Sequence, residues 1–412
     1  MKKILKIGGI LLLSAIIFFA GMIYGAYSVT NEARNKIDIK EIILPKELFI
    51  EDFTEIHEIV KRNYSHLENK KINADSLFHL YLEHIQAAKT HDEYNNLLLA
   101  YFSELKNGHT NLILSSSYSI NCDVKLIENR VFIDRVGRSV AIKGINVNDE
   151  IIAVDGIPVL EWINRQQKFV SASTDEDRLN RAAQRVFFSS LDGERTLLLN
   201  TQIGEKEVSI SFVKTAKNNI RSFAVNDSIG YICIFSMQEN VVEEFKKEFE
   251  KLKTMPTLII DLRFNGGGNS GFSEEITEYL IRKDQMACVS GRILKPAANH
   301  YEGKLAVLIG INTFSAAESF VLDLKESGNA TLIGSVTGGD TGNRPNNFTT
   351  KHGTSFRIPT RKPSKVSPQG FPMEGIGIEP DIAVYQTVYD YLNDVDTILE
   401  FAIKNVSGIE KK

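Results

Sequence analysis

Two segments of this chain share one construction, an apolar run followed by a turn of small residues and the start of a helix. The first is residues 257–260 (TLII), followed by DLRFNGGG; the second is residues 305–311, followed by NTFSAAE. Short apolar runs bounded by such turns are typical of strands buried on both faces of a layered α/β core. The second turn places the hydroxyl of Ser315 at a helix N-terminus, beside backbone N–H groups that lack helical partners. The chain therefore offers a nucleophile and an amide-lined hollow for an oxyanion.

The composition is that of an ordinary globular protein, with 412 residues, 43% hydrophobic and 24% charged. The net charge is -4 and no long basic run occurs, which argues against a nucleic-acid partner. Three widely spaced cysteines (Cys122, Cys233 and Cys288) give neither a disulfide framework nor zinc-ligand spacing, and we interpret them as small buried residues. The histidines form no metal motif, so we expect no metal and no cofactor.

The N-terminus has the features of an exported protein. Three lysines among the first six residues precede residues 7–31, which carry no charge. That stretch is longer than the ~7–15 residues of a signal-peptide core and close to the ~20 residues that span a bilayer. We favour an uncleaved single-pass anchor over residues 1–30, although Ala26 and Ser28 leave a cleaved signal peptide open. In either case the lysines stay inside and the rest of the chain lies outside the cytoplasm, anchored to the cell membrane or secreted.

Three regions follow the N-terminal segment. Residues 31–110 have apolar positions at three- and four-residue steps and predict a helical cap. Residues 111–215 predict short strands, and residues 144–159, with a strand and an Asp-Gly turn, resemble the late part of a PDZ domain. Residues 216–412 alternate strands and helices, which predicts an α/β core. That core should end in one helix near residues 387–406.

Four motifs in order along the chain resemble those of the tail-specific (C-terminal processing) and tricorn-like serine peptidases, peptidase family S41. These are DLRFNGGG at residues 261–268, TFSAAE at 313–318, LIGSVTGG at 332–339 and EGIGIEPD at 374–381. The resemblance implies an α/β core like that of crotonase and the Clp protease, with a helical cap and a β-rich, PDZ-like insert. It also implies a polypeptide substrate.

The family has two catalytic styles. Tail-specific proteases use a lysine base about 25 residues after the serine, but the corresponding position here is Asp340, so a serine–lysine dyad is not expected. The resemblance to the tricorn-like style implies Ser315 as nucleophile, His109 as base and Glu374 as the acid that orients it. Backbone N–H groups of Gly267 or Gly268 and of Ala316 would then form the oxyanion hole. The chain departs from the tricorn pattern at Gly108, where a serine is expected.

We therefore predict an exported or membrane-anchored serine endopeptidase that works through an acyl-enzyme. The alternative is a catalytically inactive, peptide-binding or scaffolding member of the same superfamily, which the missing lysine and Gly108 favour. An acyl-CoA enzyme is a more distant third. Purely structural roles also stay open for the three residues. Ser315 would then only cap its helix, and His109 would pack under the helical cap region. Glu374 would form an ion pair with Arg344, Arg357 or Arg361. Oligomeric state is not predicted.

Overall fold

The structure is a computed structural model that describes residues 43–114, 118–189, 193–212, 219–341, 344–361, 370 and 374–406. The predicted N-terminal anchor or signal peptide, residues 1–30, lies outside this part of the chain. No helix within the described ranges has the length and apolar character needed to cross a membrane.

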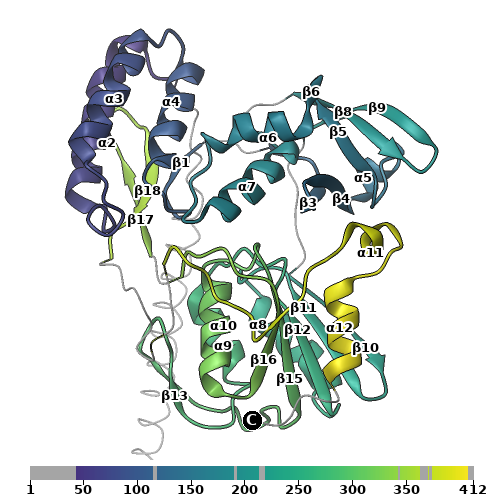
Figure 1. The fold of residues 1–412 in the computed structure, drawn as a ribbon. Helices are drawn as coiled ribbons and strands as arrows, with labels where there is room; N and C mark the ends of the chain where they lie inside the picture. The colour runs from purple at the N-terminus through teal and green to yellow at the C-terminus, as the bar shows by residue number, and fades with distance from the viewer. Residues whose placement is uncertain are drawn as a thin grey trace, which may run out of the picture. The chain divides into compact units, whose positions relative to one another are not determined.

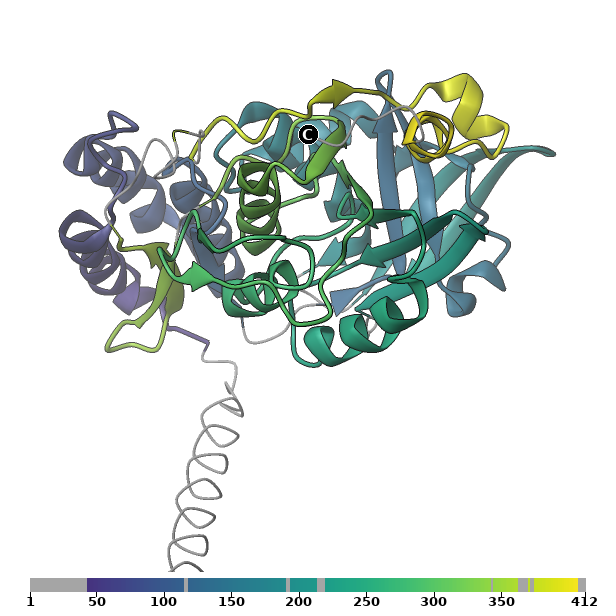
Figure 2. The ribbon, with the colours of Figure 1, turned by 90° about the horizontal axis from the view of Figure 1, so that it is seen from below.

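The α/β core is built on a six-stranded sheet with the order β10-β11-β12-β15-β16-β19, in which only β10 runs antiparallel to its neighbour. Side chains alternate along β11, so Ile232 and Ile234 pack towards α8 and α10, while Tyr231 and Cys233 face α12. Figures 1 and 2 show the helices flanking this sheet. The bounds are β10 (Ile220–Asn226), β11 (Ile229–Ile234), α8 (Val241–Leu252), β12 (Thr257–Asp261), α9 (Ser270–Thr277), β13 (Gln285–Met286), β14 (Ile293–Leu294), β15 (Lys304–Ile309), α10 (Ala316–Ser327), β16 (Ala330–Gly334), β19 (Ile382–Ala383), α11 (Val388–Leu392) and α12 (Thr397–Asn405).

The single C-terminal helix predicted over residues 387–406 is wrong, because the structure has two helices, α11 and α12, separated by a turn. Asp394 in that turn has a φ of 57°. Asp396 then caps α12 by accepting a hydrogen bond from the N–H of Leu399 at 3.0 Å. The same carboxylate accepts hydrogen bonds from the guanidinium of Arg263 at 2.7 Å. This contact with a residue just after β12, distant in the chain, fixes where α12 begins.

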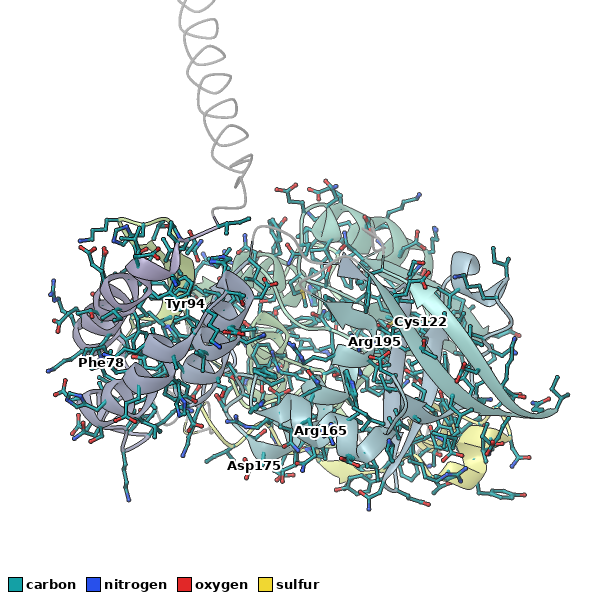
Figure 3. All side chains as sticks on the ribbon, turned by 90° about the horizontal axis from the view of Figure 1, so that it is seen from above. Phe78, Tyr94, Cys122, Arg165, Asp175 and Arg195 are labelled. Carbon is teal, nitrogen blue, oxygen red and sulfur yellow. The ribbon has the colours of Figure 1, made fainter. Side chains whose placement is uncertain are left out.

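The cap combines helices with a small sheet, two strands of which come from a distant part of the chain. Aromatic rings dominate its core: Tyr94 stacks on Phe49 with centroids 4.4 Å apart, and Phe78 packs on Phe53 at 5.1 Å. Figure 3 labels Tyr94 and Phe78 among the helices of the cap. The hairpin β17–β18 pairs with β1 and adds Phe356 to this core. The bounds are η1 (Lys46–Leu48), α2 (Phe49–Asn63), α3 (Ala74–Ala87), α4 (His91–Ser103), β1 (Asn111–Ile113), β17 (Pro345–Thr349) and β18 (Ser355–Pro359).

The β-rich region has its own apolar core, closed by helices α6 and α7 over a sheet of order β3-β4-β5-β8-β9. The predicted Asp-Gly turn is confirmed: Asp155 and Gly156 have φ values of 50° and 75° and join β5 to β6. The bounds are β2 (Tyr118–Ser119), β3 (Cys122–Ile127), β4 (Arg130–Val136), α5 (Arg138–Ala141), β5 (Glu150–Val154), β6 (Ile157–Pro158), α6 (Val159–Gln167), α7 (Asp175–Gln184), η2 (Arg185–Phe187), β7 (Phe188–Ser189), β8 (Glu194–Thr201) and β9 (Gly204–Ser211).

The three cysteines are buried and form no disulfide.

Candidate active site

Ser315 lies at the turn between β15 and α10 and has a strained backbone, with φ 58° and ψ -118°. A residue with a side chain seldom adopts a positive φ, and such strain persists only where the surroundings fix it. Here the N–H of Ser315 donates to Glu318 Oε2 at 3.0 Å, and the N–H of Phe314 donates to the carbonyl of Asn265 at 3.0 Å. The turn thus holds the serine at the start of α10, where it lines a cavity.

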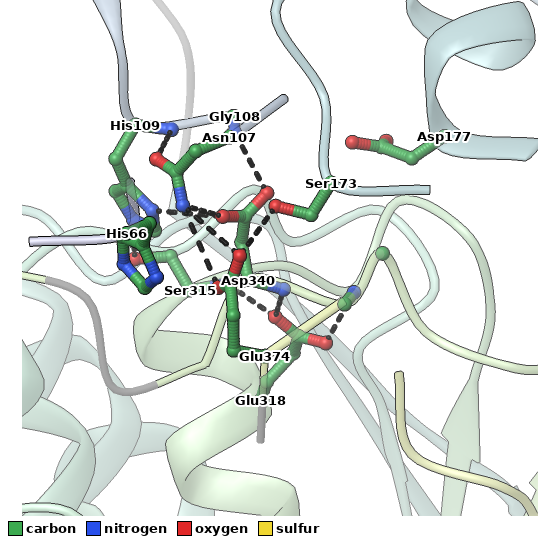
Figure 4. A network of polar contacts seen from close by, with 12 residues as sticks. His66, Asn107, Gly108, His109, Ser173, Asp177, Ser315, Glu318, Asp340 and Glu374 are labelled. Atoms are coloured by element: carbon green, nitrogen blue, oxygen red, sulfur yellow. Dashed lines mark hydrogen bonds and ion pairs between the residues drawn. The ribbon is translucent and has the colours of Figure 1, made fainter. Parts of the chain in front are cut away.

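His109 reaches this serine from the cap, in the turn between α4 and β1. Its Nε2 lies 2.7 Å from Ser315 Oγ (Figure 4). The ring stacks on Phe314 with centroids 5.0 Å apart, and the backbone N–H donates to Asn107 Oδ1 at 2.9 Å. Because the imidazole is buried and held on two sides, its Nε2 is in position to accept the serine proton.

The carboxylate that faces the other side of this imidazole belongs to Asp340. Its Oδ1 lies 3.5 Å from His109 Nδ1, which is ion-pair distance but longer than a good hydrogen bond, and Nδ1 has no hydrogen-bond partner among the described residues. Asp340 is fully buried, and it accepts hydrogen bonds from Asn107 Nδ2 at 2.7 Å and from the N–H of Gly108 at 2.9 Å. Burial alone would raise the pKa of Asp340, but His109 and the charge of Arg181 hold that pKa below its ordinary value.

Gly108 is required by this arrangement. A Cβ at position 108 would lie 2.5 Å from Asp340 Oδ2 and 2.8 Å from Phe314 Cζ. No side chain fits there without moving the carboxylate or the aromatic ring. The glycine at position 108, where the tricorn pattern has a serine, therefore leaves the space that the carboxylate of Asp340 needs.

Glu374, which we assigned to orient His109, contacts other groups. It forms an ion pair with Lys70 at 2.6 Å and accepts a hydrogen bond from Ser173 Oγ at 3.0 Å. Asn107 Nδ2 lies 3.3 Å from the same carboxylate. Among the described residues, Asp340 supplies the carboxylate within ion-pair distance of His109, so the assignment of Glu374 is revised.

The ion-pair partner of Glu374 is thus a lysine of the cap, and not one of the arginines considered from the sequence. Lys70 and Ser173 belong to segments with no motif of their own, and Asn107, although it stands beside Gly108 and His109, has no sequence signal for its contacts with the two carboxylates.

Glu318 ties the serine turn to the loop that carries Asp340. One of its oxygens accepts from Thr337 Oγ1 at 2.6 Å and from the N–H of Gly339 at 2.8 Å. The other accepts from the N–H groups of Ser315 and Asp340, both at 3.0 Å. Burial raises the pKa of Glu318 to about 7, against the hydrogen bonds that favour its ionised form. These contacts give Glu318 a positioning role at the start of α10.

The glycine turn brings backbone amides to the serine. A Cβ at Gly267 would lie 2.8 Å from Ser315 Cβ and 2.9 Å from the nitrogen of Ala316, so the two turns touch. The N–H of Gly267 itself donates to Asn265 Oδ1 at 2.8 Å, which removes it from the expected oxyanion hole. The N–H groups of Gly268 and Ala316 have no acceptor among the described residues and are the donors that remain.

A cavity of about 670 Å³ opens in front of Ser315. Gly268 and Ala316 line one part of it, and arginines from the β17–β18 hairpin and its flanks line another. In the described part of the chain, no group of three His, Cys, Asp or Glu side chains is placed to hold a metal ion.

Known family models match parts of the cap, the β-rich region and the α/β core. Residues 228–384 match the model described as Peptidase family S41. The chain belongs to peptidase family S41. Residues 126–211 match the model described as Bacteroidetes, Peptidase, S41 family, N-terminal domain, and residues 45–103 match the Tricorn protease C1 domain.

Among curated relatives, the S41 chain is 27% identical to carboxy-terminal processing protease CtpB of Bacillus subtilis over 200 residues, 46% of this chain and 40% of that protein. It is 30% identical to Tricorn protease of Thermoplasma acidophilum over 181 residues, 43% of this chain and 16% of that protein. The matched part spans half or less of the curated relatives. Among solved structures, mature CPAF complexed with lactacystin has a TM-score of 0.70 at 14% identity, over 88% of this chain and 99% of that one, which shows a shared fold.

Proposed function

We propose that this chain is a serine endopeptidase in which Ser315 attacks the peptide carbonyl and His109 is the general base. The observation that carries the proposal is the 2.7 Å contact between His109 Nε2 and Ser315 Oγ, on a turn whose strain is supported by surrounding hydrogen bonds. Membership of family S41 gives independent support for serine peptidase chemistry.

In the proposed reaction, Ser315 Oγ forms a bond to the carbonyl carbon while its proton passes to His109 Nε2. The oxyanion that forms would accept hydrogen bonds from the N–H groups of Gly268 and Ala316. His109 then gives the proton to the leaving amine as the C–N bond breaks, which leaves an acyl-enzyme on the serine. A water molecule, deprotonated by the same imidazole, attacks the ester and releases the second product.

Asp340 takes the role of the orienting acid in this proposal. Its ionised carboxylate favours the tautomer of His109 with the proton on Nδ1 and stabilises the imidazolium that forms during attack. The 3.5 Å separation from Nδ1 needs only a small tilt of the ring to become a hydrogen bond, and such contacts often tighten when substrate binds. Glu374 would act at one remove, as a positioning residue paired with Lys70 that helps to hold Asn107.

We further propose that the protein acts outside the cytoplasm, attached to the membrane or released, as its N-terminal lysines and uncharged segment suggest. The helical cap, the β-rich region and the α/β core would be its three working domains.

The test is intact-protein and peptide mass spectrometry after treatment with a fluorophosphonate. One adduct on Ser315, absent in Ser315→Ala and strongly slowed in His109→Ala, is the expected result. An adduct that forms equally fast without His109 would mean another base. No adduct on a folded protein would favour the inactive, peptide-binding alternative.

A further inference from the structure

The cavity in front of Ser315 has an unbalanced positive lining. Three arginines line it, Arg344, Arg357 and Arg361, and no Asp or Glu does so among the described residues. They come from one structural unit, because Pro345 pairs with Pro359 and the two ends of the β17–β18 hairpin therefore lie together. The open end of this hairpin presents its guanidinium groups to the same space as the nucleophile.

None of these three guanidinium groups has a carboxylate partner in the described part of the chain. Arg357 is the most significant, since it is partly buried and burial, together with the nearby charge of Arg181, lowers its pKa. Arg181 is itself paired with Asp177 at 2.6 Å and so does not need a further acid. A guanidinium withdrawn from water without a partner is costly, which suggests that its partner arrives with a ligand.

The local sequence has no acid to supply that partner. Between Asp340 and Glu374 the chain has six lysines and arginines and neither aspartate nor glutamate, in a protein whose overall net charge is -4. The two flanking acids are already engaged, Asp340 by Asn107 and Gly108 and Glu374 by Lys70. Lys351 of this segment is paired with Glu51 of the cap, whereas the three cavity arginines are left for a group outside the chain.

We infer that this cavity selects peptides that carry carboxylates close to the bond to be cleaved, through Arg344, Arg357 and Arg361. The planar guanidinium forms paired hydrogen bonds with a carboxylate, which gives the contact both strength and direction. Three separate groups suit an acidic segment better than a single charge. The carboxylates can come from Asp and Glu side chains or from a peptide C-terminus. As a statement about cleavage the inference rests on the proposed function, but as a statement about binding it can be tested alone.

The binding experiment uses Ser315→Ala protein, which cannot turn over substrate, and fluorescent peptides in an anisotropy assay. Four peptides have the same length and differ only in their carboxylates. The first has Glu and Asp side chains and an amidated C-terminus, and the second has Gln and Asn in their place with the same amidated C-terminus. The third has Gln and Asn with a free C-terminal carboxylate, and the fourth has Glu and Asp with a free C-terminal carboxylate. We expect the acidic peptide to bind ~10- to 100-fold more tightly than its amide isostere, as charge-assisted hydrogen bonds would give. Tighter binding only of the free-carboxylate peptide would instead assign the arginines to a C-terminus.

In the Ser315→Ala protein, we expect the ratio of the affinities for the acidic and the amide peptide to fall towards one when a cavity arginine is replaced, in Arg357→Gln, Arg344→Gln or Arg361→Gln. Arg62→Gln is the matched control, because it removes one positive charge from an exposed helix position that is paired with Glu58 at 3.8 Å. High salt should also weaken the preference. Equal binding of acidic and amide peptides, or a preference unchanged in all three cavity variants, would overturn the inference.

Activity measurements separate this inference from the proposed function. The same arginine variants with Ser315 intact should still react with fluorophosphonate, which shows that the site is folded. Their kcat/KM should fall for acidic peptides and stay near the parent value for amide peptides. A parent that labels and cleaves without preferring acidic peptides would refute the inference alone. A parent that binds acidic peptides but neither labels nor cleaves would refute the proposed function alone.

Discussion

Replacing Asp340 with asparagine tests the proposed relay most directly, because the change removes one charge and almost no volume. At the observed 3.5 Å, and with an effective dielectric constant of about 20, an aspartate attracts an imidazolium by about 5 kcal/mol. Asn107 and Gly108 donate to the same carboxylate and disperse its charge, so we expect a smaller loss, a decrease in kcat of about 10²- to 10³-fold. KM should change little, since the imidazolium exists only as the serine attacks.

The assay is steady-state cleavage of a fluorogenic peptide, with the rate of fluorophosphonate labelling as a second measurement that needs the same base. Glu374→Gln is the matched control, since it also exchanges a buried acid for its amide but contacts Asn107, Lys70 and Ser173 instead of the His109 ring. Its cost should be about tenfold or less, as expected for a residue that positions another. Thermal unfolding of both variants checks that the fold is kept.

Two results would refute the assignment of Asp340. One is a larger loss in Glu374→Gln than in Asp340→Asn, which would return the orienting role to the residue that the family motif indicates. The other is an Asp340→Asn variant with an unchanged kcat, which would mean that the 3.5 Å contact has no part in the reaction.

Three further expectations follow from the same geometry. Glu318→Gln should lower the stability of the protein but make it depend less on pH. In the parent, the folded pKa of Glu318 is raised from 4.5 to about 7, so the folded state loses on the order of 3 kcal/mol of stability as pH rises between those values. Denaturant unfolding of parent and variant at several pH values measures this difference. Gly108→Ala should destabilise the protein by about 1–3 kcal/mol and impair labelling of Ser315, since its Cβ would meet Asp340 at 2.5 Å. Thermal unfolding and fluorophosphonate labelling measure these effects, and a variant with the stability and labelling rate of the parent would contradict the prediction. Asp340→Lys should not restore activity to His109→Ala, and peptide cleavage well above the single variant would show that a lysine base fits after all.

Much of the core could be predicted because local pattern and tertiary environment agree there. The buried strand predicted over residues 257–260 lies within β12, and the serine and glycine turns touch, in agreement with the single oxyanion hole that the family resemblance implies for them. Strands buried on both faces leave continuous apolar runs, and the turns that end them need small residues. Both signals are local, so one sequence is enough to find them.

The relay acid was beyond this kind of prediction. A motif carried the expectation to Glu374, whereas Asp340 faces His109 only because Gly108, more than 200 positions earlier, leaves room for its carboxylate. In the sequence, the missing lysine and the missing serine are interpreted as support for the inactive alternative, and neither is connected with a relocated carboxylate. Considered together, the two departures do indicate the relay acid, because an aspartate at position 340 can approach His109 only if the residue at position 108 is small.

The site is assembled from all three regions, which has a physical consequence for how activity is maintained. The cap contributes Lys70 and His109, the β-rich region contributes Ser173, and the core contributes Ser315 and Asp340. Lys70 and Glu374 are both largely buried, so parting the cap from the core would leave two charges without partners as well as separating base from nucleophile. Because breaking such a pair costs several kcal/mol, the ion pair favours the arrangement in which His109 meets Ser315. In the proposed mechanism Glu374 therefore acts on the reaction by holding the cap in place, a role that a sequence motif cannot distinguish from direct contact with the base.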